Sequence, residues 1–174
     1  MLNGIIIEGA ENTGKTTLCT KLMNLSRVPY LHMSKNYGFK KGQFDYVNGY
    51  LDKVKEQNKG YIFDRCYVSE LAYGKLRGTE NITKDMQEQI ESFLRERRYF
   101  VVLLDTDRIP WDKNRQHSIT YEDNIRIKEL FREVFETLNI DKMILDPINN
   151  DSLNRVYEKW LMNSRVLYRA ISMH

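Results

Sequence analysis

The apolar run from Leu2 to Glu8 leads directly into a glycine-rich stretch, Gly9 to Thr17, which reads GAENTGKTT. Residues 16–26 then carry the pattern of a helix. A short, continuously apolar run bounded by glycine is typical of a buried strand. The sequence therefore predicts a strand, a tight loop and a helix at the start of the chain.

Strand-like and helix-like segments alternate along the rest of the chain. Because the strand-like runs are continuously apolar, they are expected to be buried on both faces, as in a parallel sheet with helices on either side. We therefore expect one α/β domain over residues 1–174. Strands are expected at residues 2–8, 29–33, 61–64, 99–105 and 142–145. Helices are expected at residues 16–26, 44–54, 66–76, 83–97, 121–138 and 153–167.

Composition adds little about the partner. The net charge of +3, from 27 basic and 24 acidic residues among 174, suits anionic small molecules as well as nucleic acid. Cys19 and Cys66 lack metal-ligand spacing, which favours a reduced, intracellular chain. No secretory leader and no membrane-spanning apolar run is visible, so we expect a soluble, cytoplasmic protein.

The glycine-rich stretch fits the P-loop pattern, with Gly9 and Gly14 separated by four residues and followed by Lys15 and Thr16. Its backbone N–H groups and the following helix would cradle phosphates. Lys15 would reach the β- and γ-phosphates, and the Thr16 hydroxyl would ligate Mg²⁺. This predicts ATP and Mg²⁺ as ligands. The expected nucleotide-binding residues are Gly9, Asn12, Thr13, Gly14, Lys15, Thr16 and Thr17.

A regulatory GTPase would use the same cradle, but it would also carry DxxG after the third strand and NKxD for guanine. Here the third strand ends in Asp64-Arg65-Cys66-Tyr67, and the chain contains no NKxD. The sequence therefore disfavours a switch protein.

Asp64 and Arg65 close the third expected strand, where parallel sheets place their ligands. The acid would support Mg²⁺ through water, and the arginine would grip an anionic acceptor bidentately. The alternative is a local salt bridge between the two side chains at a helix start.

The segments IIIEGAENTGKTTLCTKL and YIFDRCYVSELAYGK resemble the thymidylate kinase family and its deoxynucleoside kinase relatives. That family carries EGxDGxGKTT, then DRY, then a helix beginning SSLAYQG. The stretch LLDTDR followed by YEDNIRIKELFREVFE also resembles the family's fourth strand, lid and following helix. The resemblance implies five parallel strands in the order 2-3-1-4-5 and transfer of the ATP γ-phosphoryl group to a nucleotide phosphate. It also implies a possible homodimer.

By this resemblance, Arg65 would clamp the acceptor phosphate and Asp64 would support the Mg²⁺ shell. Glu11 would approach the 3′-hydroxyl of the acceptor sugar. Phe44 would stack on the base, and Tyr73 would line the base pocket.

The chain departs from the family at several positions. Cys66 replaces the tyrosine of DRY, and Asn12 replaces a P-loop glycine. The arginine expected near residue 46 for thymine recognition is absent, and residues 32–35 replace the family's acid-proline. These changes leave the phosphate chemistry intact and leave the base and the form of the acceptor open.

The polar segment 106–120 is expected to act as a lid that excludes water from the phosphates. Among its basic residues we favour Arg115 as a catalytic group. The alternative is a solvated loop whose cations balance Asp107 and Asp112. The candidates are Arg108, Lys113 and Arg115.

A monophosphate acceptor is already anionic, whereas a hydroxyl acceptor needs a base. The related nucleoside kinases place that base after the second strand, where this chain offers no acid, so the resemblance favours a monophosphate acceptor, although Glu8, Glu11 and Asp64 remain open as bases. One alternative is a kinase for a hydroxyl of a nucleoside or of a nucleic acid, which makes nucleic acid a possible but not a favoured partner. A second is a nucleotide-binding module without transfer activity.

Other conspicuous side chains receive structural interpretations. Cys66 is interpreted as a buried thiol. His32 and His117 have no identifiable partners in the sequence, so no ligand role is expected for them, and Trp111 either caps the lid or covers apolar surface. Tyr157, Trp160 and Tyr168 recur at core spacing in the last helix, where they would pack internally or at a dimer interface.

Overall fold

The computed structural model describes residues 4–32, 60–108, 111, 119–148 and 151–160. Its helices and strands begin and end within a few residues of the expected bounds. The expected helix 44–54 and the end of the last helix lie outside the described residues. The elements are β1 (Ile5–Glu8), α1 (Lys15–Ser26), β2 (Tyr30–His32), β3 (Ile62–Asp64), α4 (Tyr67–Arg77), α5 (Lys84–Glu96), β4 (Phe100–Leu104), α6 (Tyr121–Thr137), β5 (Lys142–Leu145) and a helix over 152–160.

The five strands form one sheet in the order β2-β3-β1-β4-β5, and every pair is parallel. In the middle of the sheet, Ile6 of β1 lies opposite Phe63 of β3 on one side and Val101 of β4 on the other. The predicted α/β class and strand order are confirmed. Parallel pairing brings the carboxyl ends of all five strands to one edge of the sheet.

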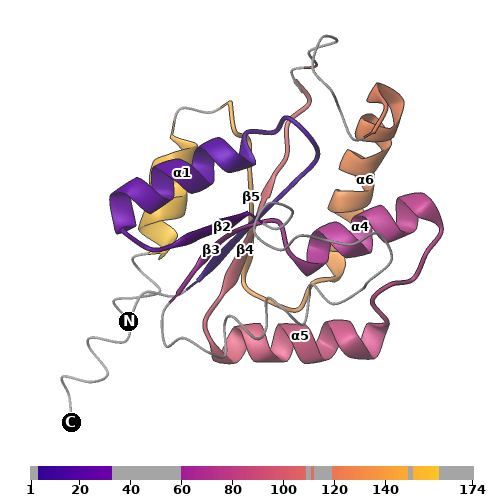
Figure 1. Cartoon of the computed structure of the whole chain (residues 1–174), viewed down its shortest axis with the longest axis horizontal. Helices are drawn as coiled ribbons and strands as arrows, with labels where there is room; N and C mark the ends of the chain where they lie inside the picture. Colours follow the sequence, from indigo (N-terminus) through magenta and orange to yellow (C-terminus); the bar gives the residue numbers. More distant parts are fainter. Residues whose placement is uncertain (1–3, 33–59, 109–110, 112–118, 149–150, 161–174) are drawn as a thin grey trace.

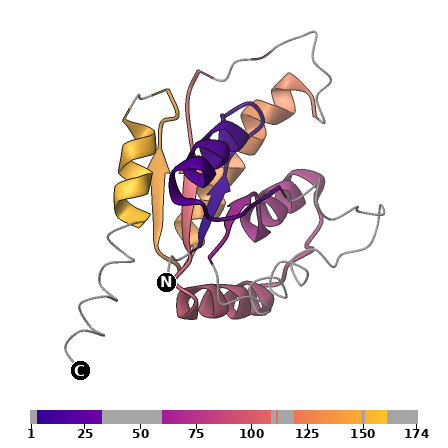
Figure 2. The same cartoon turned by 60° about the vertical axis from the view of Figure 1, so that its left-hand side comes forward.

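Helices cover both faces of the sheet, with α1 and helix 152–160 on one side and α4, α5 and α6 on the other (Figures 1 and 2). Successive β1 side chains alternate between the two layers. Ile6 joins the core under α4, α5 and α6, whereas Ile5 and Ile7 join the core under α1. Each such fully buried side chain stabilises the fold by roughly 1.5–3 kcal/mol.

The last helix packs as the sequence predicts. Val156 and Trp160 are both fully buried in the core under α1, and Tyr157 packs against that core. Tyr168 lies outside the described residues. Among the described residues, no helix has both the length and the apolar character needed to cross a membrane.

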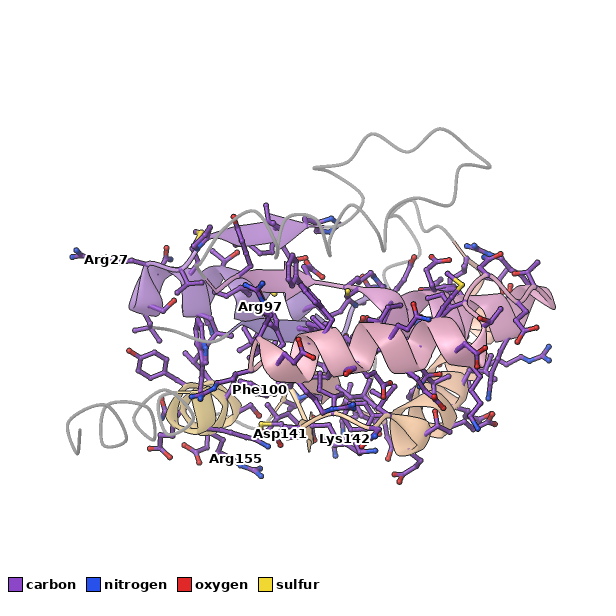
Figure 3. All side chains as sticks on the ribbon, turned by 90° about the horizontal axis from the view of Figure 1, so that it is seen from below. Arg27, Arg97, Phe100, Asp141, Lys142 and Arg155 are labelled. Carbon is purple, nitrogen blue, oxygen red and sulfur yellow. The ribbon has the colours of Figure 1, made fainter. Side chains whose placement is uncertain are left out.

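An ion pair and a helix cap lie at the amino-terminal end of the sheet, near Phe100, Asp141 and Lys142, which Figure 3 labels. Lys159 pairs with Asp141 at 2.8 Å and lies 5.6 Å from the centre of the Phe100 ring. Lys142 donates to the carbonyl oxygens of Phe135, Glu136 and Leu138 at the end of α6. A cation at this position satisfies carbonyl groups that the helix leaves open.

Candidate phosphate-binding and transfer site

The loop between β1 and α1, residues 9–17 and here called the P-loop, depends on its two glycines. Gly9 has a φ of 144°, and a Cβ at this position would lie 2.6 Å from the carbonyl oxygen of Leu104. Gly14 has a φ of 84° and begins α1 without a side-chain cap. A Cβ at Gly14 would meet no atom within 4 Å, so the backbone there borders open space. The uncapped N–H groups of α1 are therefore available to an anion.

Lys15 folds back onto the P-loop and is 7 % exposed. Its ammonium group donates to the carbonyl oxygen of Ala10 and to the Thr13 hydroxyl, the latter at 3.3 Å. Burial, followed by the positive charge of Arg65, lowers the pKa of Lys15 to about 7. The two cations thus influence each other at the same end of the sheet, where an anion would be attracted.

Thr16 and Asp64 lie side by side although 48 residues separate them. The Thr16 hydroxyl, in the first turn of α1, donates to Oδ2 of Asp64 at 2.6 Å. Asp64 ends β3 and is 1 % exposed. Hydroxyl and carboxylate oxygens are hard ligands that suit Mg²⁺, which keeps several waters and phosphate oxygens in its shell. The pair fits that ion, and the described part of the chain offers no cluster of three or more His, Cys, Asp or Glu for another metal.

Asp64 is also held from β2. The Tyr30 hydroxyl donates to Asp64 Oδ2 at 3.0 Å, and His32 Nε2 lies 3.6 Å from the same atom. Burial and the Asp64 charge raise the pKa of Tyr30. The sequence offers no identifiable partner for His32, whereas in the structure the parallel register places His32 directly opposite Asp64. No spacing in the sequence indicates this contact.

Arg65 follows Asp64 in a left-handed backbone conformation, with a φ of 73°. Such a conformation is strained for a residue with a side chain and often marks a functional site. Its guanidinium donates to the Ser69 hydroxyl at 3.1 Å and lies 5.4 Å from the centre of the Tyr73 ring. These two described neighbours, Asp64 and Arg65, therefore do not form the local salt bridge that was the alternative.

Tyr73 lies in the middle of α4 and is 9 % exposed. Its ring packs edge-on against Phe131 of α6, with 6.1 Å between ring centres. The guanidinium of Arg77 lies 5.5 Å from the same ring. Burial raises the pKa of Tyr73, so its hydroxyl stays protonated. The ring thus lies beside the guanidinium groups of Arg65 and Arg77.

Glu8 ends β1 and is fully buried. One carboxylate oxygen accepts from the backbone N–H groups of Cys66 and Ser69 at 2.7 and 3.3 Å, and the other accepts from the Ser69 hydroxyl at 2.5 Å. Burial raises the pKa of Glu8 to about 7. The carboxylate caps the start of α4, which sequence reasoning missed. Because both oxygens are engaged and shielded, Glu8 is unsuited to act as a base on a substrate.

Cys66 lies next to Glu8, and Glu11 lies in the P-loop. Cys66 is 3 % exposed, and burial raises the pKa of its thiol, so its interpretation as a buried thiol is confirmed. Glu11 is held by its backbone: its N–H donates to Asn124 Oδ1 at 2.9 Å, and its carbonyl accepts from Asn124 Nδ2 at 3.4 Å. Asn124 is a fully buried residue of α6 that sequence reasoning missed.

The stem of the expected lid is tied to α6. Arg132 donates to Asp105 at 2.6 Å and to Asp107 at 3.2 Å, and Lys128 donates to Asp107 at 2.8 Å. The alternative in which basic residues of the lid balance Asp107 is therefore wrong for this residue, because both of these cations come from α6. Trp111 packs edge-on against Tyr121. Arg108 is exposed, whereas Phe44, Asp112, Lys113, Arg115 and His117 lie outside the described residues.

Several solved structures share this fold. YorR of Bacillus subtilis, in complex with phosphorylated GDP, has a TM-score of 0.69 and 22 % identity over 95 % of this chain and 97 % of that one. Deoxyadenosine kinase of M. mycoides, with dCMP and dCDP bound, has a TM-score of 0.59 and 17 % identity over 92 % and 99 % of the chains. Shikimate kinase of Aquifex aeolicus has a TM-score of 0.51 and 15 % identity over 92 % and 95 %. These likenesses establish the fold of P-loop kinases.

Comparison of the amino-acid sequence gives fewer matches than comparison of the fold. No curated protein matches the chain. A family model described as an AAA domain matches residues 31–151, a span that begins after the P-loop and includes Asp64, Arg65 and Tyr73. Because this match covers more than half of the chain, the protein belongs to that AAA-domain family.

Proposed function

We propose that this protein is a nucleotide kinase that transfers the γ-phosphoryl group of ATP to a deoxynucleoside monophosphate of thymidylate-like type. The observation that carries the proposal is the 2.6 Å contact between the Thr16 hydroxyl and the Asp64 carboxylate. The next described residue, Arg65, directs its guanidinium to Ser69 and forms no ion pair with Asp64. A phosphate cradle and an anion-binding arginine then lie at one edge of the sheet. The shared fold with proteins named as kinases supports the same class of activity.

On the donor side, the P-loop N–H groups and Lys15 would bind the ATP phosphates. The triphosphate would restore the positive charge of Lys15, because an adjacent anion favours the protonated amine. Thr16 and Asp64 would hold Mg²⁺, which when bound neutralises phosphate charge. The Tyr30 hydroxyl and His32 would keep the Asp64 carboxylate in one orientation.

On the acceptor side, Arg65 would bind the phosphate of the monophosphate bidentately. An oxygen of that phosphate attacks the γ-phosphorus, the bond from that phosphorus to the β,γ-bridging oxygen breaks, and ADP leaves. Tyr73 and Glu11 would contact the base and sugar, and Phe44 would stack on the base. Arg115 would add positive charge from the lid segment. Such transfer depends on positioning and charge neutralisation rather than on covalent help.

The state of the carboxylates favours a monophosphate over a hydroxyl acceptor. A hydroxyl must lose a proton to a nearby base. Glu8 is buried with both oxygens engaged, and Asp64 Oδ2 already accepts from Thr16 and Tyr30. A monophosphate needs no such base.

One observation favours a second candidate, a kinase for a nucleoside hydroxyl. His32 ends β2 within 3.6 Å of Asp64, so an imidazole lies where this chain has no acid after the second strand. Under this candidate the imidazole, rather than a carboxylate, would accept the proton of the hydroxyl. A nucleotide-binding module without transfer activity is the remaining alternative.

A panel of acceptors separates the three candidates. The protein is incubated with ATP and Mg²⁺ and with each deoxynucleoside monophosphate, each nucleoside or an oligonucleotide with a free 5′-hydroxyl, and phosphorylated products are measured by chromatography. We expect phosphorylation of a monophosphate, thymidylate first. Phosphorylation of nucleosides alone supports the second candidate. ATP binding without transfer to any acceptor supports the binding module.

A further inference from the structure

Three side chains form a line from the core to the acceptor side of the site. The Arg65 guanidinium donates to the Ser69 hydroxyl at 3.1 Å, and that hydroxyl donates to Glu8 Oε2 at 2.5 Å. Glu8 itself is fixed because its other oxygen, Oε1, accepts two backbone N–H groups at the start of α4. Ser69 is 5 % exposed and Glu8 is fully buried, so water does not compete for these contacts.

We propose that Glu8 and Ser69 are positioning residues for Arg65, an inference that rests on the role proposed above for this arginine. A hydroxyl has one proton and two lone pairs. Because the Ser69 proton is directed to Glu8, it does not point at Arg65, and a lone pair of the hydroxyl is left to accept from the guanidinium. The buried Glu8 carboxylate therefore orients the Ser69 hydroxyl for its hydrogen bond with Arg65, although Glu8 is not part of that hydrogen bond.

The contacts of Arg65 with Ser69 and Tyr73 also keep its guanidinium away from the neighbouring residue, Asp64. A free arginine beside an aspartate would be expected to fold onto that carboxylate. Here the Ser69 hydroxyl and the face of Tyr73 hold the guanidinium elsewhere, while Asp64 stays with Thr16 and Tyr30. Because Asp64 and Arg65 have separate partners, the Asp64 carboxylate would be available to the metal ion and the Arg65 guanidinium to the acceptor.

The hydrogen bond between Ser69 and Arg65 would contribute to catalysis by holding the guanidinium in place before the acceptor binds. An unrestrained arginine loses rotamer entropy when a ligand immobilises it, and an arginine already held by Ser69 loses less. The positive charge of Arg65 lowers the pKa of Glu8, although burial has the larger and opposite effect.

Three substitutions test the line of contacts. Ser69→Ala removes the hydroxyl but keeps the backbone N–H that Glu8 caps. Glu8→Gln keeps the Oε1 acceptor, but its amide would donate to Ser69 and would no longer hold the hydroxyl proton away from Arg65. Ser69→Thr keeps a hydroxyl at the same place. Ser152→Ala is the matched control, since Ser152 is a similarly buried serine whose hydroxyl donates to the Asp146 carbonyl under the opposite face of the sheet.

For kinetics, kcat and KM are measured for ATP and for thymidylate, or for the acceptor that the panel identifies. We expect Ser69→Ala and Glu8→Gln to lower kcat/KM for the acceptor by roughly 10- to 100-fold, with the KM of ATP changed less than about 2-fold. Ser69→Thr should recover most of the loss, and Ser152→Ala should match the wild type. In an Arg65→Lys background, Ser69→Ala should cost less than about 3-fold, because the positioned group is already gone.

Side-chain NMR gives a readout that does not require activity. The Arg65 guanidinium resonance is assigned by its loss in Arg65→Lys, and the rotation of the guanidinium is measured in the absence of substrate. We expect faster rotation in Ser69→Ala and in Glu8→Gln, and the wild-type rate in Ser152→Ala.

Unchanged rotation in both site variants, or full additivity of Ser69→Ala with Arg65→Lys, would overturn the positioning role. An inert wild type would instead overturn the proposed function, and the NMR rates would still decide whether Glu8 and Ser69 position Arg65.

Discussion

The Oγ1 atom of Thr16 lies 2.6 Å from the Oδ2 atom of Asp64, joining the first turn of α1 to the end of β3. The contact exists because β1 and β3 are neighbours in a parallel sheet, so the helix after one strand starts beside the end of the other. Two hard oxygen ligands then converge next to the P-loop. This pair is where metal dependence would originate.

The first prediction concerns that oxygen pair. Asp64→Asn replaces a charged metal ligand by a neutral one, so we expect kcat to fall by roughly 100-fold or more with the KM for the acceptor little changed. The dependence of the rate on Mg²⁺ concentration should shift to higher Mg²⁺. Steady-state kinetics over a Mg²⁺ titration measures both effects.

Two threonines on α1 provide the matched control. Thr16→Ala should shift the same Mg²⁺ titration, whereas Thr20→Ala, one turn later, removes only an exposed hydroxyl that donates to the Thr16 carbonyl. A Mg²⁺ response that is identical in Thr16→Ala and Thr20→Ala would refute the assignment of Thr16 to the metal.

The second prediction concerns Arg65. Arg65→Ala should lower kcat/KM for the acceptor by roughly 100- to 1000-fold, the loss typical of a preorganised donor that stabilises transition-state charge. ATP affinity, measured by calorimetry, should change little because the arginine contacts the acceptor side.

Loss of a strained backbone residue must be separated from loss of the guanidinium. Arg98 also has a positive φ, of 59°, at an exposed turn before β4, so Arg98→Ala reports the backbone effect alone. If Arg65→Ala weakens ATP binding as much as it weakens transfer, the binding-module alternative gains support.

The third prediction concerns pH. Burial raises the pKa of Glu8 from 4.5 to about 7, so the folded state holds a proton that the unfolded chain releases above pH 4.5. The free energy of unfolding should therefore fall as pH rises from 4.5 to about 7, by on the order of 3 kcal/mol from this group. Glu8→Gln removes that dependence.

Urea unfolding at several pH values measures this difference. The stability of Glu8→Gln relative to the wild type should improve as pH rises from about 4.5 to about 7, most steeply between the unfolded and folded pKa values, and level off above the folded pKa. A constant difference between the two proteins across this range would contradict the raised pKa.

The fourth prediction concerns the clamp between α6 and the P-loop. Asn124→Leu leaves the buried N–H of Glu11 without its acceptor, which costs about 1–3 kcal/mol. We expect a melting temperature lower by several degrees and a raised KM for ATP, because the P-loop loses its tie to α6. Asn154→Leu, an exposed asparagine on helix 152–160, should leave both quantities near wild type.

Local patterns in the sequence predicted most of the strands and helices of the fold. The continuously apolar runs at residues 2–8 and 99–105 predicted buried strands, and the P-loop spacing predicted the turn and the start of α1. These features depend on neighbouring residues, so periodicity and spacing are sufficient to find them. The strand order came from family resemblance, since spacing along the chain does not determine it.

Contacts between distant segments were not readable in the same way. His32 meets Asp64, and Asn124 meets Glu11, only because of strand register and helix packing. Glu8 was noted at a strand end, yet its cap on α4 requires knowing that β1 and β3 are adjacent. Sequence spacing gives no measure of such distances.

The sequence alone determined the residue types that can bind phosphate and metal, because glycine, lysine, threonine, aspartate and arginine have fixed chemistry wherever they lie. The tertiary structure decided which of them meet and which are kept apart. It paired Asp64 with Thr16, directed Arg65 to Ser69, and placed the buried Glu8 carboxylate against the Ser69 hydroxyl. The physical reason is that hydrogen bonds and charge act over a few ångströms, a range that only the packing of strands and helices sets.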